Sequence, residues 1–471
     1  MDVTTLNAVE LAKGYRKGDF TVRSVVQAYL DKIEKENHKF NVYLEVFNDV
    51  LEAADRADAI LQKEGANAHV LCGVPIAVKD NILIEGKIAS AASKMLENHV
   101  ATYDATAIDR LKKTGAVFLG RTNMDEFAMG TSTEHSAFGP TKNPIDPTRV
   151  PGGSSGGSAA AVSALLAPIA LGTDTGGSVR QPASLCGVYG FKPTYGGISR
   201  FGLIAMGSSL DQLGVITRNV SDIEEVFSVV KGHDKNDATS LPSVGDMPVK
   251  NKKIGVPRAF IADAEPDVVE EFEKSLEVLK EKGYEIVDIE LPIIGHALAA
   301  YYIIMPAEVS TNLTRFDGVR YGLHLEGDNL LDEYKKTRAA GFGAETRRRI
   351  VLGTYLLSSG YAEAYYHRAT ALRSTLVKDL DAIFEDVAYI ATPTAPRPAF
   401  KVGEKQDPVS LYLEDVFTVS ANLAGIPAIS VPHAQVARDG VQLPVGIQFM
   451  SQKRTEQALF SIARDLMGEE A

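Results

Sequence analysis

The chain has 471 residues, 45% of them hydrophobic and 23% charged, with a formal net charge of −12 at pH 7. This composition is typical of a soluble globular protein, and an acidic chain does not by itself favour binding to nucleic acid phosphates. The sequence contains no apolar run of about 20 residues and no secretory signal, so we expect no membrane span. The two cysteines, Cys72 and Cys186, lack metal-site spacing, which indicates free thiols in the cytoplasm.

The N-terminal part of the chain predicts helices. Thr21 is a typical N-cap residue, and apolar residues recur after it from Val22 to Ile33 at the spacing of one helix face. A second helix is predicted for residues 48–63. Both helices should pack one apolar face onto a core.

Short, almost wholly apolar segments then alternate with helical patterns. Strands are predicted at 72–78, 116–119, 168–172, 253–256, 285–289, 387–390, 428–431 and 445–449. Helices are predicted at 105–114, 158–166 and 267–282, with one long helix at 345–380. Continuous apolar strands between helices indicate a sheet covered on both faces, so we predict an α/β protein with an α/β/α sandwich.

We predict one domain over residues 1–471. The polar, turn-rich segment 232–252 interrupts the pattern, but strand signals resume after it. It is therefore expected to be a surface excursion within the domain rather than a domain boundary.

A glycine- and serine-rich run, VPGGSSGGS, occupies residues 150–158. A flexible linker is one interpretation, but a helix and a buried strand follow at once. A phosphate cradle is another, although the lysine of a P-loop is missing. The run also matches the GxSxG pattern of a nucleophile elbow at Ser154, but the residues before it read as an irregular loop rather than the required strand.

A second run of this kind, GTDTGGS, occupies residues 172–178 and follows a predicted strand. Sites in open α/β sheets form where strands end, and small residues allow several backbone N–H groups to point at one oxyanion. Ser178 would stand at the mouth of this loop. A tight turn capped by a serine is the alternative.

A nucleophilic serine needs a base. None of the nine histidines lies in a glycine-rich or strand-end motif, whereas Lys79 ends a buried apolar segment. Burial can lower a lysine pKa enough to supply a neutral amine near pH 7. A simple ion pair with a carboxylate such as Asp80 remains the alternative for Lys79.

Lys79, Ser154 and Ser178, each within its motif, together resemble the amidase signature family. The most specific stretch is PGGSSGGSAAAVSALLAPIALGTDTGGSVRQPASLCGVYGF at residues 151–191, and the GVPIAVKD segment precedes it. The resemblance extends over nearly the whole chain and implies a large mixed sheet. One departure is Ala92, which stands where the family usually has a glycine, in segment 89–93.

The resemblance implies a Ser–Ser–Lys triad. Ser178 would attack an amide carbonyl, Ser154, after a cis peptide bond, would relay the proton, and Lys79 would be the base. The backbone amides of Thr175, Gly176, Gly177 and Ser178 would form the oxyanion hole. Ammonia would leave, and water would then hydrolyse the acyl-enzyme.

Within the family, segments such as RTNMDEFAMG (121–130) and RFDGVRYG (315–322) resemble the glutamine-hydrolysing subunits of tRNA-dependent amidotransferases. Such a subunit would release ammonia for a B subunit that amidates misacylated Glu-tRNA or Asp-tRNA with ATP and Mg²⁺. A small C subunit would brace the pair. No cofactor or metal is implied for this chain itself.

Glutamine carries an ammonium and a carboxylate, so its pocket needs one anion and one cation. The resemblance indicates Asp415 for the ammonium and Arg349, within the run Arg347–Arg349, for the carboxylate. Tyr302 of the pair Tyr301–Tyr302 would line the pocket. Each charge could instead belong to a solvated helix face.

Two other functions stay open at this point. One is a stand-alone amidase for a small aliphatic or aryl amide, which would not need Arg349 and Asp415. The other is a catalytically silent scaffold, which the complete triad argues against.

Overall fold

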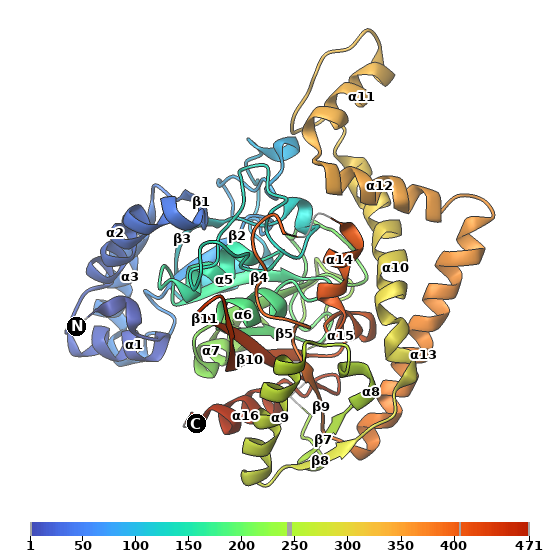
Figure 1. The fold of residues 1–471 in the computed structure, drawn as a ribbon. Coiled ribbons are helices and arrows are strands. Elements are labelled where there is room, and N and C mark those ends of the chain that lie inside the picture. Colours follow the sequence, from blue (N-terminus) through green and yellow to red (C-terminus); the bar gives the residue numbers. More distant parts are fainter. Residues whose placement is uncertain (1, 243–246, 405–406, 470–471) are drawn as a thin grey trace.

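The structure is a computed structural model that describes residues 2–242, 247–404 and 407–469 (Figure 1). Over these residues the strands form one eleven-stranded sheet in the order β1-β3-β2-β4-β6-β5-β10-β11-β9-β7-β8. The strands are β1 (Tyr43–Val46), β2 (Pro75–Lys79), β3 (Val117–Thr122), β4 (Ile169–Asp174), β5 (Tyr189–Lys192), β6 (Gln212–Thr217), β7 (Lys253–Val256), β8 (Glu285–Asp288), β9 (Tyr389–Pro393), β10 (Ala428–Arg438) and β11 (Val441–Ser451).

The sheet is mixed. Strand β2 pairs in parallel with both β3 and β4, while β4 pairs antiparallel with β6. Strands β10 and β11 form an antiparallel pair nearer its other end. The parallel neighbours β2, β3 and β4 end at the same edge, which gathers the segments that follow them.

The α-helices connect and cover the strands. They are α1 (Ala8–Lys17), α2 (Val22–Phe40), α3 (Val50–Glu64), α4 (Thr106–Lys113), α5 (Gly156–Ser163), α6 (Arg180–Cys186), α7 (Val220–Val230), α8 (Arg258–Ile261), α9 (Pro266–Glu281), α10 (Ala297–Asn312), α11 (Leu330–Gly341), α12 (Ala344–Leu356), α13 (His367–Asp386), α14 (Pro408–Tyr412), α15 (Val419–Ala424) and α16 (Glu456–Met467). In Figure 1, α11 and α12 project away from the body of the sheet.

Helices cover both faces of the sheet around β10 and β11. Side chains of consecutive strand residues point to opposite faces, and here they enter two separate apolar clusters. Ile429 and Phe449 belong to the cluster that contains α16, whereas Ala428 and Met450 belong to the one that contains α10 and α15. The predicted α/β fold with a sheet between helical layers is confirmed.

The strongly periodic N-terminal helices were predicted correctly. Thr21 caps α2, and its hydroxyl accepts a hydrogen bond from the amide of Ser24. Each predicted strand overlaps a strand of the structure, although β10 and β11 are much longer than expected. Strands β1, β5 and β6 were not predicted; β1 and β5 have only four residues each, and Gly214 divides the apolar residues of β6.

The single long helix predicted at 345–380 is wrong. Helix α12 ends at Leu356, and α13 begins only at His367, after a π-helical segment, Ala362–Tyr366. Gly360 between them has φ of +82°. This left-handed backbone conformation, which favours glycine, lets the chain turn between the two helices.

The predicted excursion at 232–252 joins α7 to β7. Its described part is attached to the body by backbone hydrogen bonds from Gly232 to Gly197 and from Leu241 to Gly196. Residues 243–246 lie outside the described residues.

One segment of the described chain, Pro292–Arg315, is long and apolar enough to pass a length-and-composition test for a membrane span. In the structure, 56% of the apolar 18-residue stretch within this segment is buried. Its helix α10 contributes Ile304, Met305 and Val309 to an apolar cluster with α13 and α15. The segment therefore serves as a core helix of this fold.

Candidate active site

Lys79 is the last residue of β2 and is completely buried. Its Nζ donates hydrogen bonds to Ser154 Oγ and Ser155 Oγ, both at 2.8 Å, and to Thr173 Oγ1 at 2.9 Å. Thr173 reaches this position because β2 and β4 run in parallel, with Val78 opposite Leu171. The lysine and the first glycine-rich loop therefore meet at the end of the parallel strands.

The Lys79 amine lies in an environment that favours its neutral form. Burial lowers its pKa from the usual value to about 7, although the carboxylates of Asp125, Asp174 and Asp211 act in the opposite direction. A substantial fraction of this amine is unprotonated at neutral pH. It can therefore accept a proton from a serine hydroxyl.

A second buried lysine shows that a lowered pKa alone does not identify a base. Burial also lowers the pKa of Lys192 to about 7. Its Nζ, however, donates to the backbone carbonyls of Pro193 and Ile426, at 2.9 and 2.6 Å. Carbonyl oxygens have no proton to give, so Lys192 has a structural role and links two segments of the chain. Lys79 differs because its partners include hydroxyl groups, which can give up a proton.

The first glycine-rich loop precedes α5. The Gly153–Ser154 peptide bond is cis, and Ser154 is completely buried. The loop is tightly packed: a Cβ added to Gly153 would lie 2.3 Å from Asp125 Oδ2. The predicted helix at 158–166 is confirmed as α5 but begins two residues earlier, at Gly156.

Ser178 lies beside this loop. Its carbonyl oxygen accepts a hydrogen bond of 3.1 Å from the amide of Ser155. The Ser178 side chain is partly accessible, with 8% of the residue exposed, and its Oγ donates no hydrogen bond to another described residue. The structure therefore brings Lys79, Ser154 and Ser178 together and leaves the Ser178 hydroxyl available.

A buried ion pair supports the loop that carries Ser178. Arg180 Nη2 and Nε donate to the two carboxylate oxygens of Asp174, at 2.9 and 3.0 Å. Burial acts to raise the Asp174 pKa, but Arg180 outweighs it and holds that pKa well below its usual range. Asn422 and Gln448 accept further hydrogen bonds from Arg180. This network fixes the backbone on both sides of Ser178.

The predicted oxyanion amides differ in their surroundings. Gly177 N donates to Asp174 Oδ1 at 2.9 Å, so this amide is already engaged. Among the described residues no acceptor pairs with the amides of Thr175, Gly176 and Ser178. Gly177 has φ of +131°, and a Cβ there would lie 2.2 Å from Thr418 Oγ1. Its role in the structure is to let the loop turn against Thr418.

The predicted substrate residues also come together. The Tyr302 hydroxyl donates a hydrogen bond to Asp415 Oδ2 at 3.0 Å. The Arg349 guanidinium lies 5.5 Å from the Tyr302 ring centre. Both charged residues are buried, with 6% of Asp415 and 3% of Arg349 exposed. They do not lie on a solvated helix face.

This cluster adjoins the Ser178 loop. Thr418 Oγ1 donates to the carbonyl of Gly176 at 2.6 Å, and the Thr418 amide donates to the carbonyl of Asp415 at 3.0 Å. A Cβ added to Gly176 would lie 2.6 Å from the hydroxyl of Tyr301. A molecule bound between Arg349 and Asp415 would therefore extend toward the backbone around Ser178.

Burial also shifts the proton equilibrium of Asp415. It raises the pKa to about 8, although the Tyr302 hydroxyl and the charge of Arg349 act to lower it. The carboxyl is therefore largely neutral at pH 7 without a bound cation. An ammonium placed against it would favour the ionised form.

The sequence reasoning missed several residues at this site. Ser155 and Thr173 share Lys79 with Ser154, and Glu345 and Tyr412 contact Arg349 or its partners. Position within the two loops could have indicated Ser155 and Thr173. The i, i+4 spacing of Glu345 and Arg349 on one helix could have indicated that pair.

Comparisons with known proteins show which family the chain matches. The family model described as Amidase matches residues 24–460. The A subunit of glutamyl-tRNA(Gln) amidotransferase from Chlorobium phaeobacteroides (strain BS1) is 49% identical over 469 residues, which cover 97% of each chain.

Two solved structures are similar as well. The A subunit of glutamyl-tRNA(Gln) amidotransferase from Thermotoga maritima, a crystal structure, is 40% identical with a TM-score of 0.78, covering 96% of this chain and 94% of that one. The native peptide amidase from Stenotrophomonas maltophilia is 27% identical with a TM-score of 0.81, covering 98% and 96%. Among the described residues, no group of three or more His, Cys, Asp or Glu side chains could hold a metal ion.

Proposed function

The chain belongs to the amidase family, and we propose that it is the glutamine-hydrolysing subunit of a glutamyl-tRNA(Gln) amidotransferase. The observation that carries this proposal is the buried pair of Arg349 and Asp415, joined by Tyr302 and placed beside the Ser178 loop. A free amino acid amide needs one cation and one anion, whereas a neutral amide needs neither.

Catalysis begins with proton transfer away from Ser178. As Ser178 Oγ bonds to the carboxamide carbon, its proton passes to Ser154, and the Ser154 proton passes to the neutral amine of Lys79. The carbonyl oxygen takes up the electron pair of the C=O π bond. The amides of Thr175, Gly176 and Ser178 then stabilise the oxyanion.

The tetrahedral intermediate collapses when the C–N bond breaks. The proton held by Lys79 returns through Ser154 to the leaving nitrogen, which departs as ammonia and leaves an acyl ester on Ser178. Water then attacks the ester carbon, and Lys79 accepts its proton through Ser154. Protonation of Ser178 Oγ releases glutamate and restores the enzyme.

The ammonia would serve a partner. In this proposal B and C subunits complete a heterotrimer, and the B subunit uses the ammonia with ATP and Mg²⁺ to amidate misacylated Glu-tRNA(Gln) or Asp-tRNA(Asn). The name of the similar proteins supports the first of these tRNAs. The unpaired, buried Cys72 and Cys186 are compatible with the cytoplasm.

The test compares the chain alone with the chain reconstituted with B and C subunits. Glutamine labelled with ¹⁵N at the amide is supplied with ATP, Mg²⁺ and Glu-tRNA(Gln), and label is sought in Gln-tRNA(Gln). We expect label transfer that is lost with Ser178→Ala. No transfer, together with rapid turnover of simple amides such as acetamide by the chain alone, would identify a stand-alone amidase instead.

A further inference from the structure

Arg349 presents only part of its guanidinium to the space around it. Nε donates to Glu345 Oε1 at 2.8 Å, and Nη1 contacts Met305 Sδ at 3.6 Å. Among the described residues nothing accepts a hydrogen bond from Nη2. Nε and Nη1 are therefore engaged within the protein, while Nη2 is left to donate to an anion such as a carboxylate.

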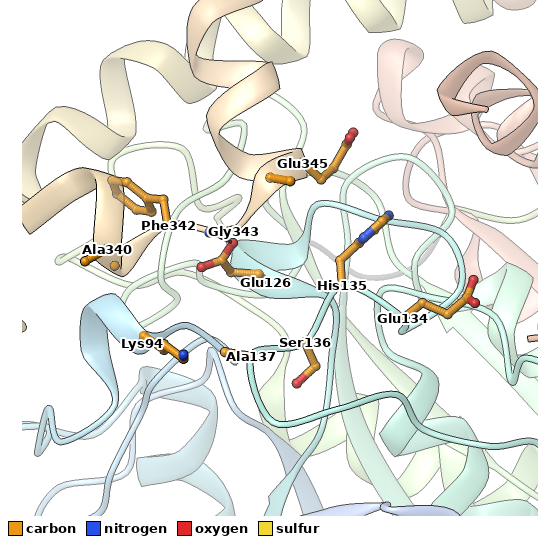
Figure 2. Close-up of a pocket in the computed structure, with 12 residues that line it drawn as sticks. Lys94, Glu126, Glu134, His135, Ser136, Ala137, Ala340, Phe342, Gly343 and Glu345 are labelled. Atoms are coloured by element: carbon orange, nitrogen blue, oxygen red, sulfur yellow. Dashed lines mark hydrogen bonds between the residues drawn. The ribbon is translucent and has the colours of Figure 1, made fainter. Parts of the chain in front are cut away.

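Glu345, which accepts the hydrogen bond from Arg349 Nε, lies at the anchored start of a helix. It lies in the first turn of α12, whose start is attached to the buried Glu126: Gly343 N and Thr346 Oγ1 donate to Glu126 Oε2 at 2.8 and 2.6 Å. Figure 2 shows Glu126 beside Gly343 at a cavity of about 380 Å³ that Glu345 also lines. The helix start, and Glu345 with it, is thus anchored to a loop that follows β3.

Tyr412 adds a second contact from another segment. Its hydroxyl donates to Glu345 Oε1 at 2.9 Å, the same oxygen that accepts from Arg349. Its ring stacks on Tyr302 with 4.0 Å between centres, and the Arg349 guanidinium lies 5.3 Å from the Tyr412 ring centre. Tyr412 therefore contacts both the carboxylate that holds Arg349 and the tyrosine that binds Asp415.

We propose that Glu345 and Tyr412 are positioning residues that orient Arg349 toward the α-carboxylate of the substrate and so select amino acid amides over neutral amides. This inference rests on the proposed glutaminase function. Glu345 is ionised at neutral pH: burial acts to raise its pKa, but Arg349 and the Tyr412 hydroxyl lower it. A charged acceptor on the Nε side restricts rotation of the guanidinium, and orientation of this kind is what places the amide over Ser178.

The test measures kcat/KM for glutamine and for 4-aminobutanamide, which is glutamine without its α-carboxylate. The variants are Glu345→Gln, which keeps the size but removes the charge, and Tyr412→Phe, which keeps the stack but removes the hydroxyl. We expect Glu345→Gln to lower kcat/KM for glutamine by about ten-fold or more, mainly through kcat, because the charge of Arg349 remains while its orientation is lost. Tyr412→Phe should show a smaller loss of the same kind.

The value for 4-aminobutanamide should stay within about two-fold of the wild type for both variants, since this substrate has no carboxylate for Arg349 to hold. Arg347→Ala, at an exposed position on the same helix, is the matched control and should leave kcat/KM unchanged for both substrates. Melting temperatures show whether each variant is folded.

Two failures can be told apart. If the wild-type enzyme shows no preference for glutamine over 4-aminobutanamide, the proposed function itself is wrong. A second outcome is that the wild type prefers glutamine but the folded Glu345→Gln variant keeps the same preference, or loses kcat/KM equally for both substrates. In that case the positioning role is overturned while the function stands.

Discussion

Lys79 Nζ lies 2.8 Å from Ser154 Oγ, although 75 positions separate the two residues in the chain. The contact depends on the parallel pairing of β2 and β4, because the loop before α5 packs against the shared end of these strands. A buried amine and a buried hydroxyl therefore face each other within hydrogen-bond distance. This geometry makes the role of the amine as a base directly testable.

The activity should rise with pH as Lys79 loses its proton. Burial lowers the Lys79 pKa to about 7, and only the neutral amine, which exists above that pKa, can accept the serine proton. We expect kcat/KM for a neutral amide such as acetamide to increase through pH 7 and level off above it. A neutral amide is used because Asp415 does not need to ionise to bind it.

Lys79→Met has a side chain of similar length without an amine and should be inactive across the range. Lys79→Arg should also be inactive, since the guanidinium stays protonated. Stopped-flow or steady-state measurement of kcat/KM as a function of pH tests both variants. If Lys79→Met keeps activity with the same inflection near pH 7, another group is the base.

Gly177→Ala should disable the loop that carries Ser178. A Cβ would lie 2.2 Å from Thr418 Oγ1, and φ of +131° is strained for alanine. Displacing the adjacent amides should lower kcat by about 10²-fold, as the loss of one oxyanion donor does in other enzymes.

Gly232→Ala is the matched control, because Gly232 has φ of +107° but nothing within 4 Å of its Cβ position. It carries the backbone strain without the collision near the site. Comparable kcat values for the two variants would mean that packing against Thr418 does not matter for catalysis.

Arg180→Leu should destabilise the protein strongly. Both Arg180 and Asp174 are completely buried, so removing the arginine leaves an unpaired carboxylate in the interior. Breaking a buried pair in this way typically costs about 3–5 kcal/mol of unfolding free energy. Urea unfolding measures the loss.

The double variant Arg180→Leu with Asp174→Asn should recover part of that loss, because the remaining side chain carries no charge. Equal unfolding free energies for the single and double variants would show that the unpaired charge is not the cause. Neither variant needs to retain activity for this measurement.

Glutamine binding should release a proton from Asp415 at pH 7. The carboxyl has a pKa of about 8 and is mostly neutral in the empty site. An ammonium bound against it would lower that pKa below 7, so binding would release about one proton. Well above that pKa the carboxyl is already ionised, and the release should vanish.

Titration calorimetry with the Ser178→Ala variant, in buffers of different ionisation enthalpy, measures the number of protons released. Tyr302→Phe tests the neighbouring hydroxyl, which donates to Asp415. With Asp415→Asn the buffer dependence should disappear. A buffer-independent binding enthalpy in the Ser178→Ala variant at pH 7 contradicts the proposed contact between Asp415 and the ammonium.

Much of the fold could be predicted where local signals are strong. The cap at Thr21 and the apolar periodicity behind it identified α2, and continuous apolar runs identified the buried strands. The helix predicted at 345–380 failed because it ran through Gly360, where a positive φ interrupts the helical backbone. Apolar spacing does not report where a chain turns back on itself.

The sequence by itself determined which residue types were available for chemistry and on which local structures they stand: a lysine at a strand end, serines in glycine-rich loops, and an arginine on a helix. Only the tertiary structure decided their chemical state. Lys79 and Lys192 are both buried, yet their partners differ. Helix α12 and the segment around Asp415 meet at Tyr302 and Tyr412. A pKa and an ion pair depend on burial and on neighbours from distant segments, and the folded chain supplies both.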